Sequence, residues 1–264
     1  MKNYPREFFL KDKIIFVAGG AGLLGGEIAQ AVSQWMAVTV ILDVNRKKGK
    51  ALEQKICKEG GKACFEFFDM TRLGRIEQNL QRLIKKYGRL DGWVNASYPR
   101  TRDWGLPLEK VKIKSFQKNI DMHLNSYIWS SRLAALEMKK NKIQGAIVNL
   151  GSIYGVQGND FTVYHGTNMT TPMAYSSIKG GIVNGTRFLA SYFGRYGIRV
   201  NTVCPGAIFD HQERKFVRNY QEKVPLQRLG KPEDVAGVVC FLLSKASSYM
   251  TGATVMVDGG WSIV

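Results

Sequence analysis

The stretch KIIFVAGGAGLLGGE, residues 13–27, gives the first indication of the fold class. Its apolar start predicts a buried strand over 13–20, and the segment after its glycines predicts a helix from about Leu24 to Trp35. Glycines at such a turn let the backbone approach a pyrophosphate, and a helix N-terminus offers free N–H groups. A glycine-rich turn alone suits any tight connection. Its place after the first strand favours a nucleotide site.

The same alternation of strand and helix continues outward to the end of the chain. Six further apolar runs predict strands at 38–43, 63–69, 92–97, 145–152, 198–206 and 252–260. Helix-length segments between them predict an α/β fold, a Rossmann-type doubly wound parallel seven-stranded sheet with helices on both faces. We see no linker or repeat, so residues 1–264 are expected to form a single domain.

Composition limits the class of protein. The chain has 38 basic and 21 acidic residues, a formal net charge of +17, which can attract nucleic acid or anionic substrates. Its basic residues are scattered along helix-like segments and are not interleaved with exposed aromatic residues. We therefore expect a solvated basic surface and no nucleic-acid binding.

The cysteine and hydropathy patterns indicate a cytoplasmic protein. The four cysteines form no C-x-x-C pair and no ligand-like cluster, so we expect reduced thiols and no metal site. The N-terminus lacks the features of a signal peptide, and no run approaches the ~18 apolar residues of a membrane span.

Three polar residues follow the later strands in a pattern that suits proton transfer. Tyr175 and Lys179 are four positions apart, so on a helix they share one face. A neighbouring ammonium favours the phenolate and makes a phenol a usable acid or base. Ser152 ends the predicted strand 145–152 and can donate a hydrogen bond to a substrate oxygen. Each residue alone is more often structural, whereas together they predict a catalytic set.

Two carboxylates close the second and third predicted strands. Asp43 can accept both ribose hydroxyls of NAD and repel the 2′-phosphate of NADP, or it can be a turn residue. Arg46 and Lys47 follow and could help a 2′-phosphate, so NAD is favoured and NADP is not excluded. Asp69 could reach the adenine edge or cap the strand end.

These motifs together resemble the short-chain dehydrogenase/reductase family over essentially the whole chain. The matching pieces are AGGAGLLG, DMT, SIYG…YSSIK, RVNTVCPG and TGATVMVDGG. The resemblance implies a Rossmann-type fold, usually tetrameric, that passes hydride between a nicotinamide and a carbon bearing oxygen. It implies that Tyr175 is the acid/base, that Lys179 lowers its pKa and holds the nicotinamide ribose, and that Ser152 positions the reacting oxygen.

The resemblance also implies the residues that contact the cofactor. They are Gly19, Gly22, Leu24, Gly25, Asp43, Asp69, Met70, Asn95, Ala96, Tyr175, Lys179, Pro205, Gly206 and Ile208. The backbone around Ile208 is expected to meet the carboxamide.

The chain departs from the family pattern at three positions. Leu23 replaces a usual glycine, and VNAS keeps only Asn95 of a usual pair of asparagines. His123 replaces the helix asparagine that completes a proton relay through water. A histidine can donate, accept and titrate near neutral pH, so His123 is either a catalytic relay residue or a packing substitution.

A narrower resemblance is to the flagellin modification protein A type, a subgroup in bacterial pathways for nonulosonic-acid and related glycan sugars. It is carried by VNASYPRTRDWG, SIYGVQGNDFTVYHGTNMTTPMAYSSIKGG and CPGAIFDHQERKF. Tyr175 follows Ser152 by 23 positions, a longer spacing than in most of the family, and the subgroup shares this insertion at about 156–172. An insertion between two site residues must leave and rejoin the site, so we expect it to roof the substrate pocket. The alternative is a surface or subunit-contact loop.

The candidate substrate residues suit a polyhydroxylated ligand. Tyr164, His165 and Asn168 lie in the insertion, and Tyr98 and Arg100 could form an opposite wall in which Arg100 holds a phosphate. We therefore expect an NAD(P)-dependent oxidoreductase that acts on a sugar, sugar phosphate or nucleotide sugar, as a dimer or tetramer. The alternatives are a reductase of 3-oxoacyl thioesters or small cyclic ketones, and a catalytically weak nucleotide-binding protein.

Overall fold

The computed structural model describes residues 4–264, so the first three residues of the expected domain lie outside it. Seven parallel strands form one sheet in the order β3-β2-β1-β4-β5-β6-β7. The strands are β1 Ile14–Ala18, β2 Val38–Asp43, β3 Lys62–Phe67, β4 Gly92–Asn95, β5 Ala146–Leu150, β6 Arg199–Pro205 and β7 Thr254–Val257. The Rossmann-type doubly wound sheet is confirmed, with strands that are mostly shorter than the sequence predicts.

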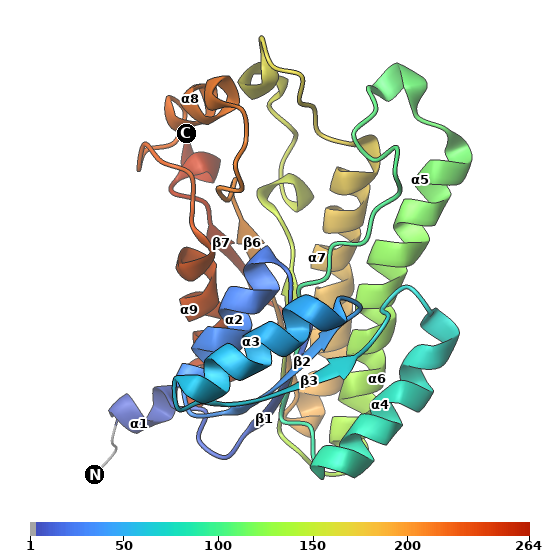
Figure 1. The fold of residues 1–264 in the computed structure, drawn as a ribbon, viewed down its shortest axis with the longest axis vertical. Helices are drawn as coiled ribbons and strands as arrows, with labels where there is room; N and C mark the ends of the chain where they lie inside the picture. The colour runs from blue at the N-terminus through green and yellow to red at the C-terminus, as the bar shows by residue number, and fades with distance from the viewer. Residues whose placement is uncertain (1–3) are drawn as a thin grey trace.

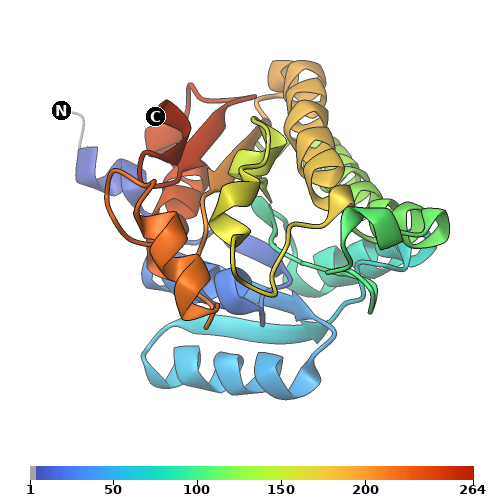
Figure 2. The same ribbon diagram turned by 90° about the horizontal axis from the view of Figure 1, so that it is seen from above.

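Helices cover both faces of the sheet (Figures 1 and 2). They are α1 Tyr4–Phe8, α2 Leu23–Gln34, α3 Arg46–Lys58, α4 Leu73–Tyr87, α5 Ile113–Asn119, α6 Ser126–Lys140, α7 Met173–Phe193, α8 Arg214–Gln221 and α9 Pro232–Leu243. Apolar side chains of α4, α6 and α7 bury one face of the sheet, and those of α2 and α9 bury the other, with α3 packed beside α2. These five helices, α2, α4, α6, α7 and α9, therefore each contribute an apolar stripe to one of two large cores.

The strand order reverses between β1 and β4, and the glycine turn packs into this point. Gly19 has φ +76°, and a Cβ there would lie 2.5 Å from the Cα of Ser97, which follows β4. A Cβ at Gly25, in the first turns of α2, would lie 2.0 Å from the Gly19 carbonyl oxygen. Side chains at these two positions would separate the turn from β4, so the geometry requires glycine.

The insertion over 156–172 folds against α8. It contains the short helix η4, Phe161–Tyr164. The side chain of Asn219 on α8 donates to the carbonyl oxygens of Val163 and His165, each at 3.1 Å. Figure 2 shows this yellow segment beside α8, above the carboxyl end of the sheet.

No helix among residues 4–264 is long and apolar enough to cross a membrane. In the same part of the chain, no group of three or more His, Cys, Asp or Glu side chains is placed to hold a metal ion.

Candidate active site

The expected Ser–Tyr–Lys set converges at the carboxyl end of β5. Ser152 follows β5 and is 4% exposed, while Tyr175 and Lys179 lie on the first turns of α7. The Lys179 Nζ donates to the carbonyl oxygen of Leu150 at 2.8 Å and lies 5.6 Å from the centroid of the Tyr175 ring. The Ser152 side chain lies near enough to Tyr175 to act on its pKa, and its Oγ accepts the backbone N–H of Tyr154 at 3.2 Å. The fold therefore brings Ser152 and Tyr175, which are 23 positions apart in the sequence, into one cluster.

The electrostatics of this cluster differ from the sequence argument. Burial raises the pKa of Tyr175 above its ordinary value, and the nearby Ser152 side chain acts in the opposite direction. Burial also lowers the pKa of Lys179 to about 7. We expected the ammonium to dominate and lower the phenol pKa. In this structure desolvation outweighs that effect, because Lys179 is buried and Tyr175 is partly buried among apolar side chains, which disfavours their charged forms.

His123 lies on a π-helical turn that the sequence did not predict. The turn, η2 Ile120–Asn125, joins α5 and α6 into one continuous helix. The His123 side chain is fully buried, and both its ring nitrogens lack a hydrogen-bond partner among the described residues. Burial, and next the charge of Lys179, holds the pKa of His123 well below 6.5. The imidazole is therefore neutral near Lys179 and can both donate and accept.

Aromatic side chains form a wall beside Tyr175. The ring centroids of Tyr98 and Trp104 lie 6.1 Å and 6.3 Å from that of Tyr175. The Trp104 Nε1–H donates to the Tyr98 hydroxyl at 3.0 Å, and the guanidinium carbon of Arg100 lies 5.3 Å from the Tyr98 ring centroid. Sequence reasoning missed Trp104, although it lies in the same loop as Tyr98 and Arg100. A tryptophan in a loop after a parallel strand was the available signal.

Of the expected substrate residues in the insertion, some lie near the aromatic wall and others do not. The Tyr164 ring stacks on Phe216 of α8 at 5.4 Å and lies near enough to Tyr175 to influence its pKa. The side chains of His165 and Asn168 are exposed, and the Asn168 backbone N–H donates to Glu213 at 3.1 Å. Thus the fold brings Tyr164 to the site, whereas no contact joins the side chains of His165 and Asn168 to Tyr175.

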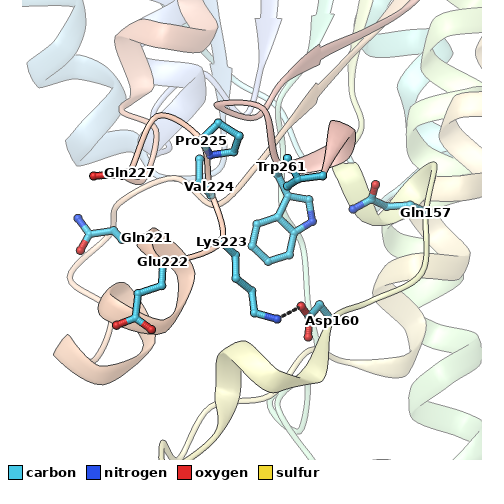
Figure 3. A pocket seen from close by; sticks show the side chains of 10 residues that line it. Gln157, Asp160, Gln221, Glu222, Lys223, Val224, Pro225, Gln227 and Trp261 are labelled. Atoms are coloured by element: carbon cyan, nitrogen blue, oxygen red, sulfur yellow. Dashed lines mark hydrogen bonds and ion pairs between the residues drawn. The ribbon is translucent and has the colours of Figure 1, made fainter.

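A hollow of about 1020 Å³ lies between the insertion and the segment 221–227 (Figure 3). Its walls include Gln157, Trp261 and the ion pair of Lys223 with Asp160. It is the larger of the two main hollows found in the described residues, but none of Ser152, Tyr175 and Lys179 lines it. We place the candidate active site by the chemistry of those three side chains rather than by the size of a hollow.

The nucleotide end contains the expected carboxylates. The two Asp43 oxygens accept the backbone N–H groups of Ala21 at 3.0 Å and Asn45 at 2.8 Å. Asp43 therefore ties the glycine turn to the end of β2, as a turn residue does. Asp69 accepts the backbone and hydroxyl of Thr71 and pairs with Arg72 at 3.3 Å, which is the geometry of a strand-end cap.

The Asn95 side chain forms hydrogen bonds inside the protein and does not face a nucleotide site. It is fully buried and donates to Asn149 at 2.8 Å and to Ser131 at 3.0 Å, which ties β4 to β5 and α6. Any cofactor contact at this position falls to the backbone. Met70 is also buried, at 5% exposure, which leaves little of its side chain for a ligand.

The remaining expected cofactor residues lie at the carboxyl ends of strands. The Ala96 N–H donates to the carbonyl of Ala18. After β6, which ends at Pro205, the Ala207 N–H donates to the Tyr220 hydroxyl at 2.8 Å, and Ile208 forms a bridge with Gly230.

The residues present fit a dinucleotide. A Cβ would fill the cradle at Gly19 and Gly25, and the N-cap of α2, Gly22, has no side chain to occupy the free N–H groups of that helix. Gly22, Leu24 and Gly206 have no polar side chain, and the N–H groups of Gly22 and Gly206 already donate to the carbonyls of Gly19 and Val257, each at 3.0 Å. A helix N-terminus of this kind is suited to a pyrophosphate.

Comparison with known proteins identifies the family. The family model described as enoyl-(acyl carrier protein) reductase matches residues 19–262. The post-translational flagellin modification protein A of Campylobacter coli is 32% identical over 96% of this chain and 100% of its own length. The chain belongs to the short-chain dehydrogenase/reductase family. It is therefore an oxidoreductase.

Two solved structures of the family extend this result. The short-chain dehydrogenase from Leptospira borgpetersenii with bound NAD⁺ has a TM-score of 0.82 and 30% identity, covering 99% of this chain and 96% of that one. A putative gluconate dehydrogenase from Agrobacterium tumefaciens has a TM-score of 0.88 and 27% identity, covering 97% of this enzyme and 98% of that chain.

Proposed function

We propose that this enzyme transfers hydride between NAD and a hydroxyl or carbonyl carbon of a sugar, sugar phosphate or nucleotide sugar used in surface-glycan biosynthesis. The observation that carries the proposal is the convergence of Ser152, Tyr175 and Lys179 at the carboxyl end of β5. The glycine cradle lies at the carboxyl end of β1, two strands away across the switch point of the sheet. Ligands of doubly wound sheets bind there.

The residues divide the chemistry as follows. A bound nicotinamide supplies the acceptor or donor of hydride at the reacting carbon. Tyr175 takes or returns the proton at the substrate oxygen, and Ser152 donates a hydrogen bond that fixes this oxygen. Lys179, whose pKa of about 7 lets it exchange a proton near neutrality, holds the cofactor ribose and restores the proton of Tyr175.

His123 is proposed to continue this proton path toward solvent. Its two buried ring nitrogens have no partner among the described residues, and leaving such groups unpartnered costs about 1–3 kcal/mol. A packing role would be served better by an apolar side chain. Because the ring is neutral and near Lys179, it can accept at one nitrogen and donate at the other.

The preference for NAD rests on Asp43. A carboxylate at the end of β2 repels a 2′-phosphate, and no Lys or Arg in residues 4–264 forms an ion pair with it. The Arg46 guanidinium carbon lies 4.3 Å from the Phe67 ring centroid, directed to an aromatic face rather than to Asp43. The solved relative from Leptospira contains NAD⁺, which agrees with this preference.

The sugar substrate is supported by polar and aromatic side chains near Tyr175. Tyr98, Arg100, Trp104 and Tyr164 offer hydroxyl, guanidinium and ring faces. The flagellin modification and gluconate relatives are named for a role or a substrate compatible with such a ligand. The acyl-carrier reductases named by the family model would require an apolar channel for the acyl chain.

We further propose that the chain acts as a single domain, with 156–172 as its substrate loop, and that it forms a homo-oligomer. The helices α6 and α7 run side by side and expose large aromatic residues: Trp129 is 43%, Tyr192 46% and Phe188 70% exposed (Figure 1). Large exposed apolar side chains on neighbouring helices are typical of a subunit interface.

The test of this function is a screen for NADH and NADPH absorbance with sugars, sugar phosphates, nucleotide sugars, 3-oxoacyl thioesters and cyclic ketones. We expect turnover of a carbohydrate with NAD. Turnover confined to thioesters or ketones would refute the proposed substrate class, and absence of any turnover together with NAD-induced stabilisation would favour a weak nucleotide-binding protein.

A further inference from the structure

The Tyr98 hydroxyl accepts a hydrogen bond within the protein but donates none to residues 4–264. Its oxygen accepts the Nε1–H of Trp104 at 3.0 Å. Among the described residues, no oxygen or nitrogen accepts the Tyr98 hydroxyl hydrogen within hydrogen-bonding distance. The phenol is protonated at neutral pH, as an ordinary tyrosine is, and burial raises its pKa further. The Tyr98 hydroxyl is therefore held as a donor that still needs an acceptor.

The position of this donor is fixed by rings on several sides. Trp104 meets the Tyr98 ring edge to face at 5.8 Å, and His123 does so at 5.5 Å. Tyr175 lies 6.1 Å away at an interplanar angle of 86°. Tyr98 nevertheless remains 44% exposed, so part of its surface is open to a ligand that reaches Tyr175. Such packing leaves the phenol few rotamers.

Trp104 occupies the acceptor position of Tyr98 and so directs its hydrogen. Without the indole N–H, the Tyr98 hydroxyl would be free to turn and accept from a ligand or from solvent. With it, one lone pair of the oxygen is occupied and the hydroxyl hydrogen is turned away from Trp104. A ligand acceptor beside Tyr98 can then pair with this hydrogen, whereas an alkyl group there would displace the water that otherwise accepts it and leave the hydrogen without a partner.

We propose that Tyr98 is a substrate-contacting, specificity-determining residue and that Trp104 is the positioning residue that makes it a donor. The substrate class is one with an acceptor oxygen (a ring, hydroxyl or carboxylate oxygen) near the carbon that reacts at Tyr175. This inference deepens the proposed function and rests on it for the identity of the acceptor as an oxygen of a carbohydrate.

A double-mutant cycle tests the pair: Tyr98→Phe, Trp104→Phe and the two together, assayed with NAD and whichever substrate the wild type turns over. We expect each single variant to lower kcat/KM by roughly 10-fold to 100-fold, mostly through KM for that substrate. KM for NAD and the NAD-induced rise in melting temperature should stay unchanged. In the Tyr98→Phe background, Trp104→Phe should have little further effect, because its N–H then has no hydroxyl to direct.

Additive effects of the two substitutions would overturn the positioning role of Trp104, and an unchanged kcat/KM in Tyr98→Phe would overturn the whole inference. The matched control is Tyr249→Phe, at a fully exposed position, which should leave kcat/KM unchanged. Should Trp104→Phe fail to fold, Tyr98→Phe alone decides. If the wild type turns over only a thioester or ketone, the proposed function fails. The double-mutant cycle, measured with that substrate, still tests whether Trp104 acts through Tyr98.

Discussion

The Lys179 Nζ lies 5.6 Å from the centroid of the Tyr175 ring and is held there by the Leu150 carbonyl oxygen at 2.8 Å. Both side chains belong to α7, but Lys179 is fixed by β5. The ammonium is therefore anchored independently of the phenol, and the two groups keep their relation when a proton leaves either one. Five predictions follow from the site built around this pair.

Removal of the Tyr175 hydroxyl should abolish catalysis without unfolding the enzyme. Tyr175→Phe keeps the ring that packs against Tyr98 and Trp104, but it removes the proton donor and acceptor. We expect NADH formation to fall by about a thousand-fold or more, with NAD-induced stabilisation retained. Tyr249→Phe, at a fully exposed position, is the control. Turnover by Tyr175→Phe close to that of the wild type would refute the mechanism.

Burial of Lys179 should cost stability in a pH-dependent way. Its pKa is about 7 in the folded protein against 10.5 as the reference value, so between these pH values the unfolded chain binds one more proton. Wild-type stability should therefore gain from this group as pH rises from about 7 to 10. Lys179→Met removes the buried charge. The free energy of unfolding of this variant should therefore exceed that of the wild type by on the order of 3 kcal/mol below pH 7, and the difference should fade toward pH 10.

The measurement is the melting temperature of nucleotide-free protein at pH 6 and pH 9.5. Lys140→Met, at an exposed position on α6, should show no such pH-dependent difference from the wild type. If Lys179→Met raised the melting temperature by the same amount at both pH values, desolvation of the ammonium would not be the cause of the stabilisation.

His123 can be tested by separating relay from packing. If it carries protons, His123→Leu should lower kcat by roughly 10-fold to 100-fold with little change in KM and should alter the pH–rate profile. The same substitution removes two unpartnered buried nitrogens, so the melting temperature should rise. His123→Asn should restore much of kcat. An unchanged kcat in His123→Leu would identify a packing substitution.

Asp43 should decide the choice of cofactor. Asp43→Asn keeps a hydrogen-bond acceptor for the glycine turn but removes the charge that repels a 2′-phosphate. We expect the ratio of kcat/KM for NAD to that for NADP to fall by about 10-fold, since loss of a charge at this range is worth ~1 kcal/mol or more. Asp121→Asn on the surface of η2 is the control. A ratio that stays constant would assign Asp43 to the turn alone.

The insertion should act on substrate binding through its attachment to α8. Asn219→Leu removes two hydrogen bonds, to the carbonyls of Val163 and His165, each worth about 1 kcal/mol. We expect KM for the substrate to rise by about 3-fold to 10-fold and 156–172 to become easier to proteolyse. Gln221→Leu on the same helix is the control. Faster proteolysis with unchanged KM would favour a surface or subunit-contact loop.

Much of the fold follows from local patterns in the chain. The apolar runs 38–43 and 198–206 reappear as β2 and β6 because continuous β-branched segments between helices are buried on both faces of a parallel sheet. The glycine turn could be predicted from the local sequence in the same way. The π-helical turn at Ile120–Asn125 could not be predicted, since it has no composition or period that distinguishes it from an ordinary helix.

The residue types and spacing of Ser152, Tyr175 and Lys179 were enough to predict them as candidate site residues from the sequence. How these groups are charged and what faces them depends on the tertiary structure. Burial, which reverses the expected shift at Tyr175, requires side chains from the loops after β4 and β5 to meet α7 in space. The pairing of Trp104 with Tyr98 depends likewise on the path of a loop, and neither desolvation nor a loop's path is encoded by residue spacing.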